Sequence, residues 1–212
     1  LTGLGNRLGT AFIDLAGGHL FLGLLMAMVI ALILGAGMPT TPAYIVQVAT
    51  VIPALISLGL PENVAHLFAF YFSCLSLISP PVAAAAFTAA AIAKADGWKT
   101  GWTASRIGMV AFVVPFMFAY DQTLLMQGEP LNVAWDMFSA GLGAVCFAMA
   151  GVGYLIRTLH WYERLLTFGI GVLLIFPHHA LSLGGMVLLA GFIFIQFYLR
   201  KKTNSAAGRL AR

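Results

Sequence analysis

The apolar sequence between residues 34 and 93 is interrupted twice by residues that do not continue a helix. The first break, residues 35–42, reads GAGMPTTP, and the second, residues 79–81, reads SPP. Proline lacks a backbone N–H and clashes with the preceding turn, and glycine loosens a helix, so we expect both breaks to be non-helical. In apolar surroundings, freed backbone groups need partners from protein or from a water-filled cavity. Two such breaks therefore predict a shared place where an ion or a solute is held.

Few charges accompany this apolar sequence. Of the 212 residues, 61% are hydrophobic and 8% are charged, whereas a soluble domain carries about 25% charged residues. We therefore predict an integral membrane protein that is all-α and polytopic. The eleven Lys and Arg residues lie in short clusters between apolar runs, so the net charge of +4 does not indicate a nucleic-acid partner. Cys74 and Cys146 lie in apolar segments and form neither a disulfide framework nor a metal motif.

The apolar runs around the breaks set the expected helices. Residues 19–34 and 43–58 flank the first break, and at 1.5 Å per residue each is about 24 Å long, short of the roughly 30 Å hydrocarbon core. A re-entrant helical hairpin and two complete crossings both fit these lengths. Residues 64–78 and 82–93 flank the second break and predict one discontinuous transmembrane helix.

The remaining sequence completes the predicted organisation. We expect helices at 108–120, 133–156, 165–176 and 181–199, with an acidic loop at 121–136. The predicted regions are an interfacial amphipathic segment (1–17), the hairpin (18–58), the broken helix (63–94), a basic connector (94–107), C-terminal transmembrane helices (108–199) and a tail (200–212).

The distribution of Lys and Arg predicts the orientation in the membrane. The basic clusters at 94–106, 157–164 and 200–202 should face the cytoplasm, and counting crossings back from the tail agrees with this at each step. The acidic loop at 121–136 and the tip of the hairpin are then expected on the outer side. The chain is thus predicted to be multi-pass, with a cytoplasmic C-terminus.

The first break offers oxygen ligands for a hard monovalent cation. Gly35 and Gly37 free backbone carbonyls, and Thr40 and Thr41 add hydroxyls. Such oxygens, from unwound backbone and from the C-terminal ends of half-helices, coordinate monovalent ions in transporters. The alternative is a Gly/Pro turn between two ordinary helices.

The second break follows a stripe of serines. Ser73, Ser76 and Ser79 recur at three-residue spacing and lead to Pro80 and Pro81. We interpret the stripe as one side of a binding site shared with the first break. The alternative is that each hydroxyl simply bonds back to a carbonyl of its own helix.

Other polar residues receive structural interpretations. Gln47 and Thr50 are expected to face protein and to pack, and His66 is expected to be a hydrogen-bonded core histidine. No carboxylate lies in the middle of a predicted span, which argues against a proton relay. The sequence lacks H-E-x-x-H, G-x-S-x-G and P-loop motifs, so we do not predict an enzyme. A channel lined by carbonyls stays open as an alternative.

Several of these stretches resemble one transporter family. The segments GAGMPTTPAYI, PALISLGLP, HLFAFYFSCLSLISPPVAAAAF and VVPFMFAY resemble the membrane subunit of tripartite ATP-independent periplasmic (TRAP) transporters. The resemblance is greatest to the fused permeases that work with TAXI-type binding proteins. It covers residues 1–126, whereas 132–199 is similar only to the variable C-terminal helices of such permeases. Many relatives have Thr-Pro-Pro where this chain has SPP, so a hydroxyl is retained.

The resemblance implies a fold and an activity. It implies an elevator-type permease of the bacterial inner membrane, driven by a sodium gradient, with a periplasmic TAXI-type solute-binding protein delivering the substrate. Organic carboxylates are the family's usual substrates. Residues 18–107 would form one half of the transport domain. The matching inverted half and a smaller four-helix part are not in these residues, so we expect the C-terminal portion of a longer permease that cannot transport alone.

The resemblance also implies roles for the two breaks. Residues 35–41 correspond to the family's hairpin tip and 77–81 to its unwound helix, which together form a sodium site and flank the substrate. No other metal or cofactor is implied. A channel-like or non-transporting membrane scaffold is the alternative function. The predicted sodium ligands are Gly35, Gly37, Thr40, Thr41 and Ser79, and the predicted substrate-side residues are Met38, Pro39, Ser76, Pro80 and Pro81.

Overall fold

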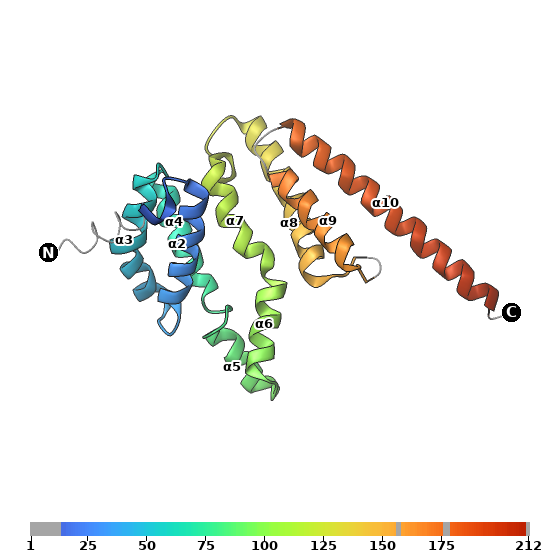
Figure 1. The fold of residues 1–212 in the computed structure, drawn as a ribbon, viewed down its shortest axis with the longest axis horizontal. Helices are drawn as coiled ribbons and strands as arrows, with labels where there is room; N and C mark the ends of the chain where they lie inside the picture. The colour runs from blue at the N-terminus through green and yellow to red at the C-terminus, as the bar shows by residue number, and fades with distance from the viewer. Residues whose placement is uncertain (1–13, 156–157, 176–178, 211–212) are drawn as a thin grey trace. The chain divides into compact units, whose positions relative to one another are not determined.

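The computed structural model describes residues 14–155, 158–175 and 179–210 (Figure 1). The regular elements of these residues are helices, and the only strand-like feature among them is an isolated bridge between Tyr154 and Thr158. The predicted all-α fold is thus confirmed. The chain forms two compact units, residues 1–122 and 123–212, which are described separately. Most of the predicted interfacial segment at 1–17 lies outside the described residues.

Three helices form the core of the first unit. Helices α2 (Leu20–Gly35) and α3 (Thr40–Ser57) make the hairpin, and α4 (Glu62–Leu75) lies beside both of them in Figure 1. Phe68 and Phe72 of α4 are fully buried, with their ring centroids 4.9 Å apart. Their rings also meet Phe116 of α7 (Met109–Tyr120), at 5.5 and 6.1 Å. Aromatic packing thus holds α7 against α4.

Helices are interrupted at both predicted breaks, but the first is shorter than the predicted residues 35–42, because Gly35 still belongs to α2 and residues 40–42 already belong to α3. The hairpin turns at residues 36–39, between the end of α2 at Gly35 and the start of α3 at Thr40. Helix α4 ends at Leu75 and α5 (Ala84–Ala93) begins nine residues later, so the predicted helix is discontinuous. The second break is longer than SPP alone, because the helix already unwinds three residues before Ser79.

The region predicted as a basic connector contains a helix. Helix α6 (Gly97–Ile107) begins after Asp96, whose side chain accepts a hydrogen bond from the N–H of Lys99 at 2.7 Å. This N-cap satisfies one of the donors that a helix start leaves free. The sequence analysis did not predict α6, because it treated these polar residues as a connector although their polar and apolar side chains lie on different sides of a helix. Helices α6 and α7 form a pair bent by 42°.

The second unit contains three helices whose bounds differ from those expected. Helix α8 (Pro130–Val152) begins inside the predicted acidic loop, so that Asp136 lies in a helix. Proline at the first helical position suits this early start, since its missing N–H would have had no partner there. Helix α9 (Trp161–Ile175) starts four residues early, and α10 (His179–Leu210) continues through most of the predicted tail.

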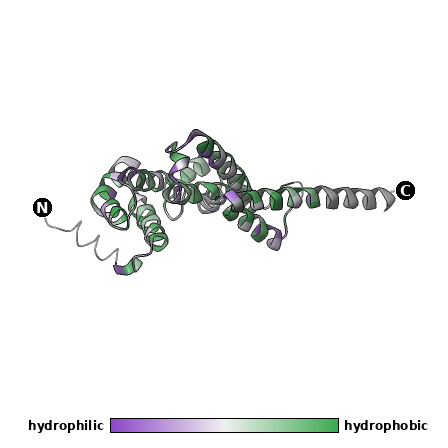
Figure 2. Ribbon diagram, turned by 90° about the horizontal axis from the view of Figure 1, so that it is seen from above, coloured by the Kyte–Doolittle hydropathy of each residue, from purple (hydrophilic) through white to green (hydrophobic). Residues whose placement is uncertain are grey.

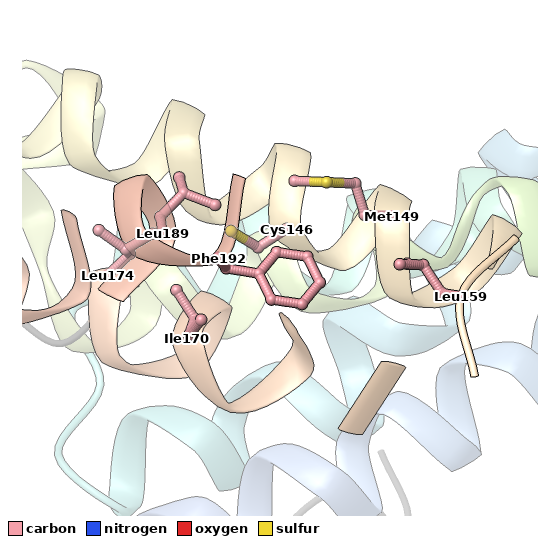
Figure 3. Close-up of a cluster of buried hydrophobic side chains, with 7 residues drawn as sticks. All are labelled: Cys146, Met149, Leu159, Ile170, Leu174, Leu189 and Phe192. Atoms are coloured by element: carbon pink, nitrogen blue, oxygen red, sulfur yellow. The ribbon is translucent and has the colours of Figure 1, made fainter. Parts of the chain in front are cut away.

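The core of the second unit lies between these helices. Figure 3 shows apolar side chains from α8, α9 and α10 converging in one cluster. Gly153, at φ 75°, ends α8 in the left-handed conformation that glycine adopts readily. The buried cluster consists of Cys146, Met149, Leu159, Ile170, Leu174, Leu189 and Phe192.

Helix length and hydropathy agree with a membrane protein. Hydrophobic colouring runs along helices of both units in Figure 2. Within the described residues, α3 and α8 are long and apolar enough to cross a membrane, whereas α6 and α7 reach that length only if the bent pair is counted as one span. Helices α2 and α5 and residues 181–196 are apolar but shorter. The hairpin therefore combines one arm of spanning length with one shorter arm.

Candidate functional site

The two breaks contact each other where α2 ends. A Cβ atom placed on Gly35 would lie 2.5 Å from Ser76 Oγ and 2.6 Å from Ser76 Cβ. Atoms at these distances overlap, so the position admits only glycine unless Ser76 moves. The contact brings the first break directly against the end of α4.

A cavity of about 310 Å³ lies between the two breaks. This volume is at the lower end of the range for small-molecule sites, about 300–1,000 Å³. Four helix termini meet around it: Gly35 ends α2, Pro39 caps the start of α3, Ser76 caps the end of α4 and Ala84 begins α5. The other lining residues are Gly37, Met38, Leu77 and Val82.

These termini present backbone groups of both signs. The last carbonyls of a helix carry partial negative charge and favour cations, while the first N–H groups carry partial positive charge and favour anions. Helices α2 and α4 reach the cavity by their C-terminal ends, and α3 and α5 by their N-terminal ends. The apolar-lined cavity thus faces helix ends of both signs without a charged side chain in its lining. The last carbonyls of α4 already accept hydrogen bonds from residues 76–79, so a cation would share their lone pairs with these donors.

Half of the predicted site residues line this cavity and half do not. Thr40 and Thr41 lie in the first turn of α3, half-buried and exposed respectively, rather than in the loop. Ser79 is buried but does not line the cavity, and its hydroxyl donates a hydrogen bond to the Leu75 carbonyl. The predicted residues in the lining are Gly35, Gly37, Met38, Pro39 and Ser76; those outside it are Thr40, Thr41, Ser79, Pro80 and Pro81.

The serine stripe bonds back to its own helix. Ser73 donates to the Ala69 carbonyl at 3.0 Å, Ser76 to the Ser73 carbonyl at 2.7 Å and Ser79 to the Leu75 carbonyl at 2.7 Å. This is the alternative interpretation of the stripe. The hydroxyl protons are thus engaged, and of the three serines Ser76 lines the cavity.

Helix α6 supports the second break, a role that the sequence analysis missed. Ser105 donates a hydrogen bond to the Ile78 carbonyl at 3.0 Å, which provides a partner for unwound backbone. A Cβ atom on Gly101 would lie 3.3 Å from Phe87 and 3.5 Å from Pro80, so α6 packs closely here. The available signal was a helix start at Asp96 followed by Gly97 and Gly101 at four-residue spacing.

Val82 and Ala84 were also missed. Both line the cavity because α5 restarts at Ala84, after Ala83 adopts a left-handed conformation at φ 37°. The sequence VAAAAF gives no local signal for the residue at which the helix resumes. Their place in the site therefore depends on the tertiary structure.

Polar residues next to the site have structural partners. Gln47, fully buried on α3, donates from Nε2 to Ser73 Oγ at 2.8 Å, in agreement with the predicted packing role. Its Oε1 is buried with no hydrogen-bond partner among the described residues. His66 Nδ1 and the Tyr44 hydroxyl are hydrogen-bonded at 2.6 Å, which confirms a hydrogen-bonded histidine. The His66 side chain is 33% exposed, so it lies at the edge of the core.

The second unit holds a buried carboxylate that the sequence analysis did not single out. Glu163, in the first turn of α9, accepts hydrogen bonds from the His160 N–H at 2.9 Å and from Gln196 Nε2 at 3.1 Å. The next residue, Arg164, donates to the carbonyls of Ala150 and Gly151 at the end of α8. These bonds join the end of α8 and the start of α9 to the middle of α10. The described residues contain no group of three His, Cys, Asp or Glu side chains suited to a metal ion.

Apolar helices, a helical hairpin and a discontinuous helix around one cavity are the arrangement expected in the membrane component of a transporter. Residues 1–129 match the family model for the tripartite ATP-independent periplasmic transporter, DctM component. Because the match covers more than half of the chain, the chain belongs to this family. The searches of curated proteins and of solved structures found no match to the chain.

Family membership confirms the predicted class of protein, a TRAP transporter membrane component. The chain is a membrane component of a TRAP transporter, multi-pass and not an enzyme. Such a component works with a periplasmic binding protein and a small membrane subunit. The match ends directly before α8 begins at Pro130, so the cavity lies within the matched region and α8, α9 and α10 lie outside it.

Proposed function

We propose that the chain supplies the ion- and solute-binding hairpin of a sodium-gradient-driven permease. In this proposal the permease takes up a small organic carboxylate that a periplasmic TAXI-type binding protein delivers. The chain works with a matching inverted half in the bacterial inner membrane, with its C-terminus in the cytoplasm. Family membership supports transport as such, and the cavity supports the choice of ion and substrate class.

The single observation that carries this proposal is the meeting of four helix termini at one cavity. Two carbonyl ends, of α2 and α4, suit a monovalent cation, and two N–H ends, of α3 and α5, suit a carboxylate. The volume of about 310 Å³ fits a small solute and excludes a large one. A cation bound beside a carboxylate also attracts it directly, which gives a physical basis for coupling.

The proposed sodium ligands are the carbonyls freed at Gly35 and Gly37, with the hydroxyls of Thr40, Thr41 and Ser79. Gly35 ends α2, Gly37 lies in the turn of the hairpin, and the threonines begin α3 on the other side of the tip. Ser79 keeps oxygen lone pairs available, since its bond to Leu75 uses its proton only.

Uptake by the full-length permease tests this assignment. Proteoliposomes with the cognate binding protein are given an inward sodium gradient, and initial uptake is measured against sodium concentration. Thr40→Val, Thr41→Val and Ser79→Ala each delete one hydroxyl. If these oxygens bind sodium, at least one change should raise the sodium concentration for half-maximal uptake about tenfold, the effect of losing roughly 1.4 kcal/mol.

Thr50→Val is the matched control. Thr50 lies on α3, and its hydroxyl bonds to the Val46 carbonyl within the same helix. The sodium dependence of this variant should equal that of the unmodified protein. Unchanged sodium activation in all three site variants would refute the ligand assignment, and solute flux that ignores the gradient would indicate a channel instead.

A further inference from the structure

Helix α6 has an outer face that its packing against the broken helix leaves free. Gly101 is its one buried residue, on the side that meets Pro80 and Phe87. Trp98 and Trp102 lie one turn apart and are 52% and 57% exposed. Their rings contact edge to face with centroids 6.2 Å apart. Exposed apolar side chains occur on many helices of this chain, but paired tryptophans are typical of the membrane–water interface.

Positive charges accompany the two indoles. Arg106 follows Trp102 at the same four-residue spacing, and Lys99 is adjacent to Trp98 in the sequence; both are exposed. At 3.6 residues per turn these four residues share about a third of the helix circumference. Asp96 is the one acidic residue in 94–107, and its carboxylate is engaged at the start of the helix by the N–H of Lys99. The face is therefore aromatic and basic.

We infer that this face of α6 binds the headgroups of anionic phospholipids. Tryptophan prefers the depth of the headgroups, where its ring is apolar and its N–H remains hydrated. Lysine and arginine beside it attract the negative phosphates of the same layer. The charge complementarity decides between lipid and a protein partner, and an amphipathic basic helix with Trp is typical of interfacial binding.

The neighbouring side of α6, where Gly101 and Ser105 each follow a tryptophan at three-residue spacing, connects this lipid contact to the candidate site. Ser105 holds the Ile78 carbonyl at 3.0 Å, and Gly101 packs against Pro80. A lipid held on the outer face would therefore fix α6 against the unwound segment that borders the cavity. The lipid-binding surface on α6 is distinct from the proposed sodium and solute site, and lipid binding there does not require sodium coupling.

Fluorescence quenching by brominated lipid tests the inference on the full-length permease in vesicles. Two sets of phosphatidylcholine vesicles are prepared. One contains acyl-brominated phosphatidylglycerol, and the other contains the same fraction of acyl-brominated phosphatidylcholine. The fluorescence of Trp98 and Trp102 is obtained by subtracting the fluorescence of the Trp98→Phe/Trp102→Phe variant from that of the unmodified protein. We expect brominated phosphatidylglycerol to quench this signal more strongly, because the anionic lipid is enriched beside α6.

Two comparisons make the result specific. Lys99→Gln/Arg106→Gln should reduce the quenching by phosphatidylglycerol to the level of phosphatidylcholine. Arg200→Gln/Lys201→Gln removes the same charge from α10 and should keep the excess. High salt should abolish the excess in the unmodified protein by screening, a measurement that needs no folded variant.

Two outcomes would overturn the inference. Equal quenching by the two lipids would show an interfacial helix without preference for anionic headgroups. No quenching by either lipid would show that protein covers the tryptophans.

Discussion

At the scale of single residues, the contact between Gly35 and Ser76 decides whether the two breaks form one site. The space for a side chain at residue 35 is already occupied by Ser76, 2.5 Å away from the place of a Cβ atom. Glycine is needed at residue 35 because Ser76 lies so close, and not because of the backbone conformation, since the φ angle of Gly35 is not positive. The walls of the cavity therefore depend on the absence of one methyl group.

Gly35→Ala should destabilise the protein and impair transport. Overpacking at a rigid contact costs about 1–3 kcal/mol, so we expect a lower midpoint of thermal unfolding in detergent together with reduced uptake. Adding Ser76→Gly removes the overlapping atoms and should recover part of both losses.

Gly141→Ala is the matched control for this substitution. Gly141 lies in α8, and a Cβ atom there would meet nothing within 4 Å. Alanine is about 1 kcal/mol more favourable than glycine inside a helix, so this change should leave stability equal or higher. A Gly35→Ala protein as stable and active as the control would contradict the proposed contact.

Substitutions in the buried pair of Gln47 and Ser73 should change the free energy of unfolding by unequal amounts. Ser73→Ala leaves Gln47 Nε2 buried without its 2.8 Å partner, which should cost about 1–3 kcal/mol of unfolding free energy. Gln47→Leu removes the amide along with its unpartnered Oε1, while Ser73 keeps its bond to Ala69. Its unfolding free energy should stay within about 1 kcal/mol or rise. Thermal unfolding of both variants would show the order; a costlier Gln47→Leu would mean that Oε1 has a partner in the working protein.

At the scale of elements, α6 stabilises a segment that cannot satisfy its own backbone. The chain between α4 and α5 leaves carbonyls outside any helix, and the Ile78 carbonyl receives its hydrogen bond from Ser105 of α6. Other groups of the segment are paired locally, as with the Ala85 N–H and the Leu77 carbonyl at 3.0 Å. The broken helix is therefore stabilised both by a hydrogen bond from α6 and by hydrogen bonds within the segment itself.

Ser105→Ala should loosen the second break. Removing the donor leaves the Ile78 carbonyl without this bond, at a cost of about 1–3 kcal/mol, so we expect earlier thermal unfolding and lower uptake. Thr103→Ala is the comparison, because Thr103 is exposed and bonds only back to the Lys99 carbonyl. Equal effects of the two substitutions would rule out a supporting role for α6.

At the scale of the whole molecule, the basic clusters predict one orientation in the membrane. The cluster at 94–106 and that at 200–202 are expected in the cytoplasm, and the connection before α8 is expected outside. In α10 the second cluster belongs to a helix that continues to Leu210, so the basic residues follow directly on the apolar part.

Cysteine labelling from outside the cell checks this orientation. In a background without other thiols, Gln127→Cys should react with an impermeant maleimide, whereas Ser205→Cys should react only after permeabilisation. Gln127 is exposed and avoids the positive φ of its neighbour Gly128. Labelling at residue 205 with protection at residue 127 would reverse the assignment.

The sequence by itself determined the features that depend on local chemistry. Proline without an N–H and glycine without a side chain disfavour a helix most where they cluster, so both breaks were predictable from residues 35–42 and 79–81. Single prolines such as Pro53 in α3 and Pro115 in α7 do not end their helices. The scarcity of charge likewise required an all-α membrane protein, and the matched family agrees with the resemblance of the hairpin and SPP segments.

Only the tertiary structure decided which groups share the cavity. Thr40, Thr41 and Ser79 stand beside the breaks in the sequence but outside the cavity lining, while Val82 and Ala84 belong to it. The reason is that a helix terminus reaches a site only when packing brings it there, as Gly35 against Ser76 does for α2 and α4. Local residue chemistry places the breaks along the chain, and long-range packing places them in space.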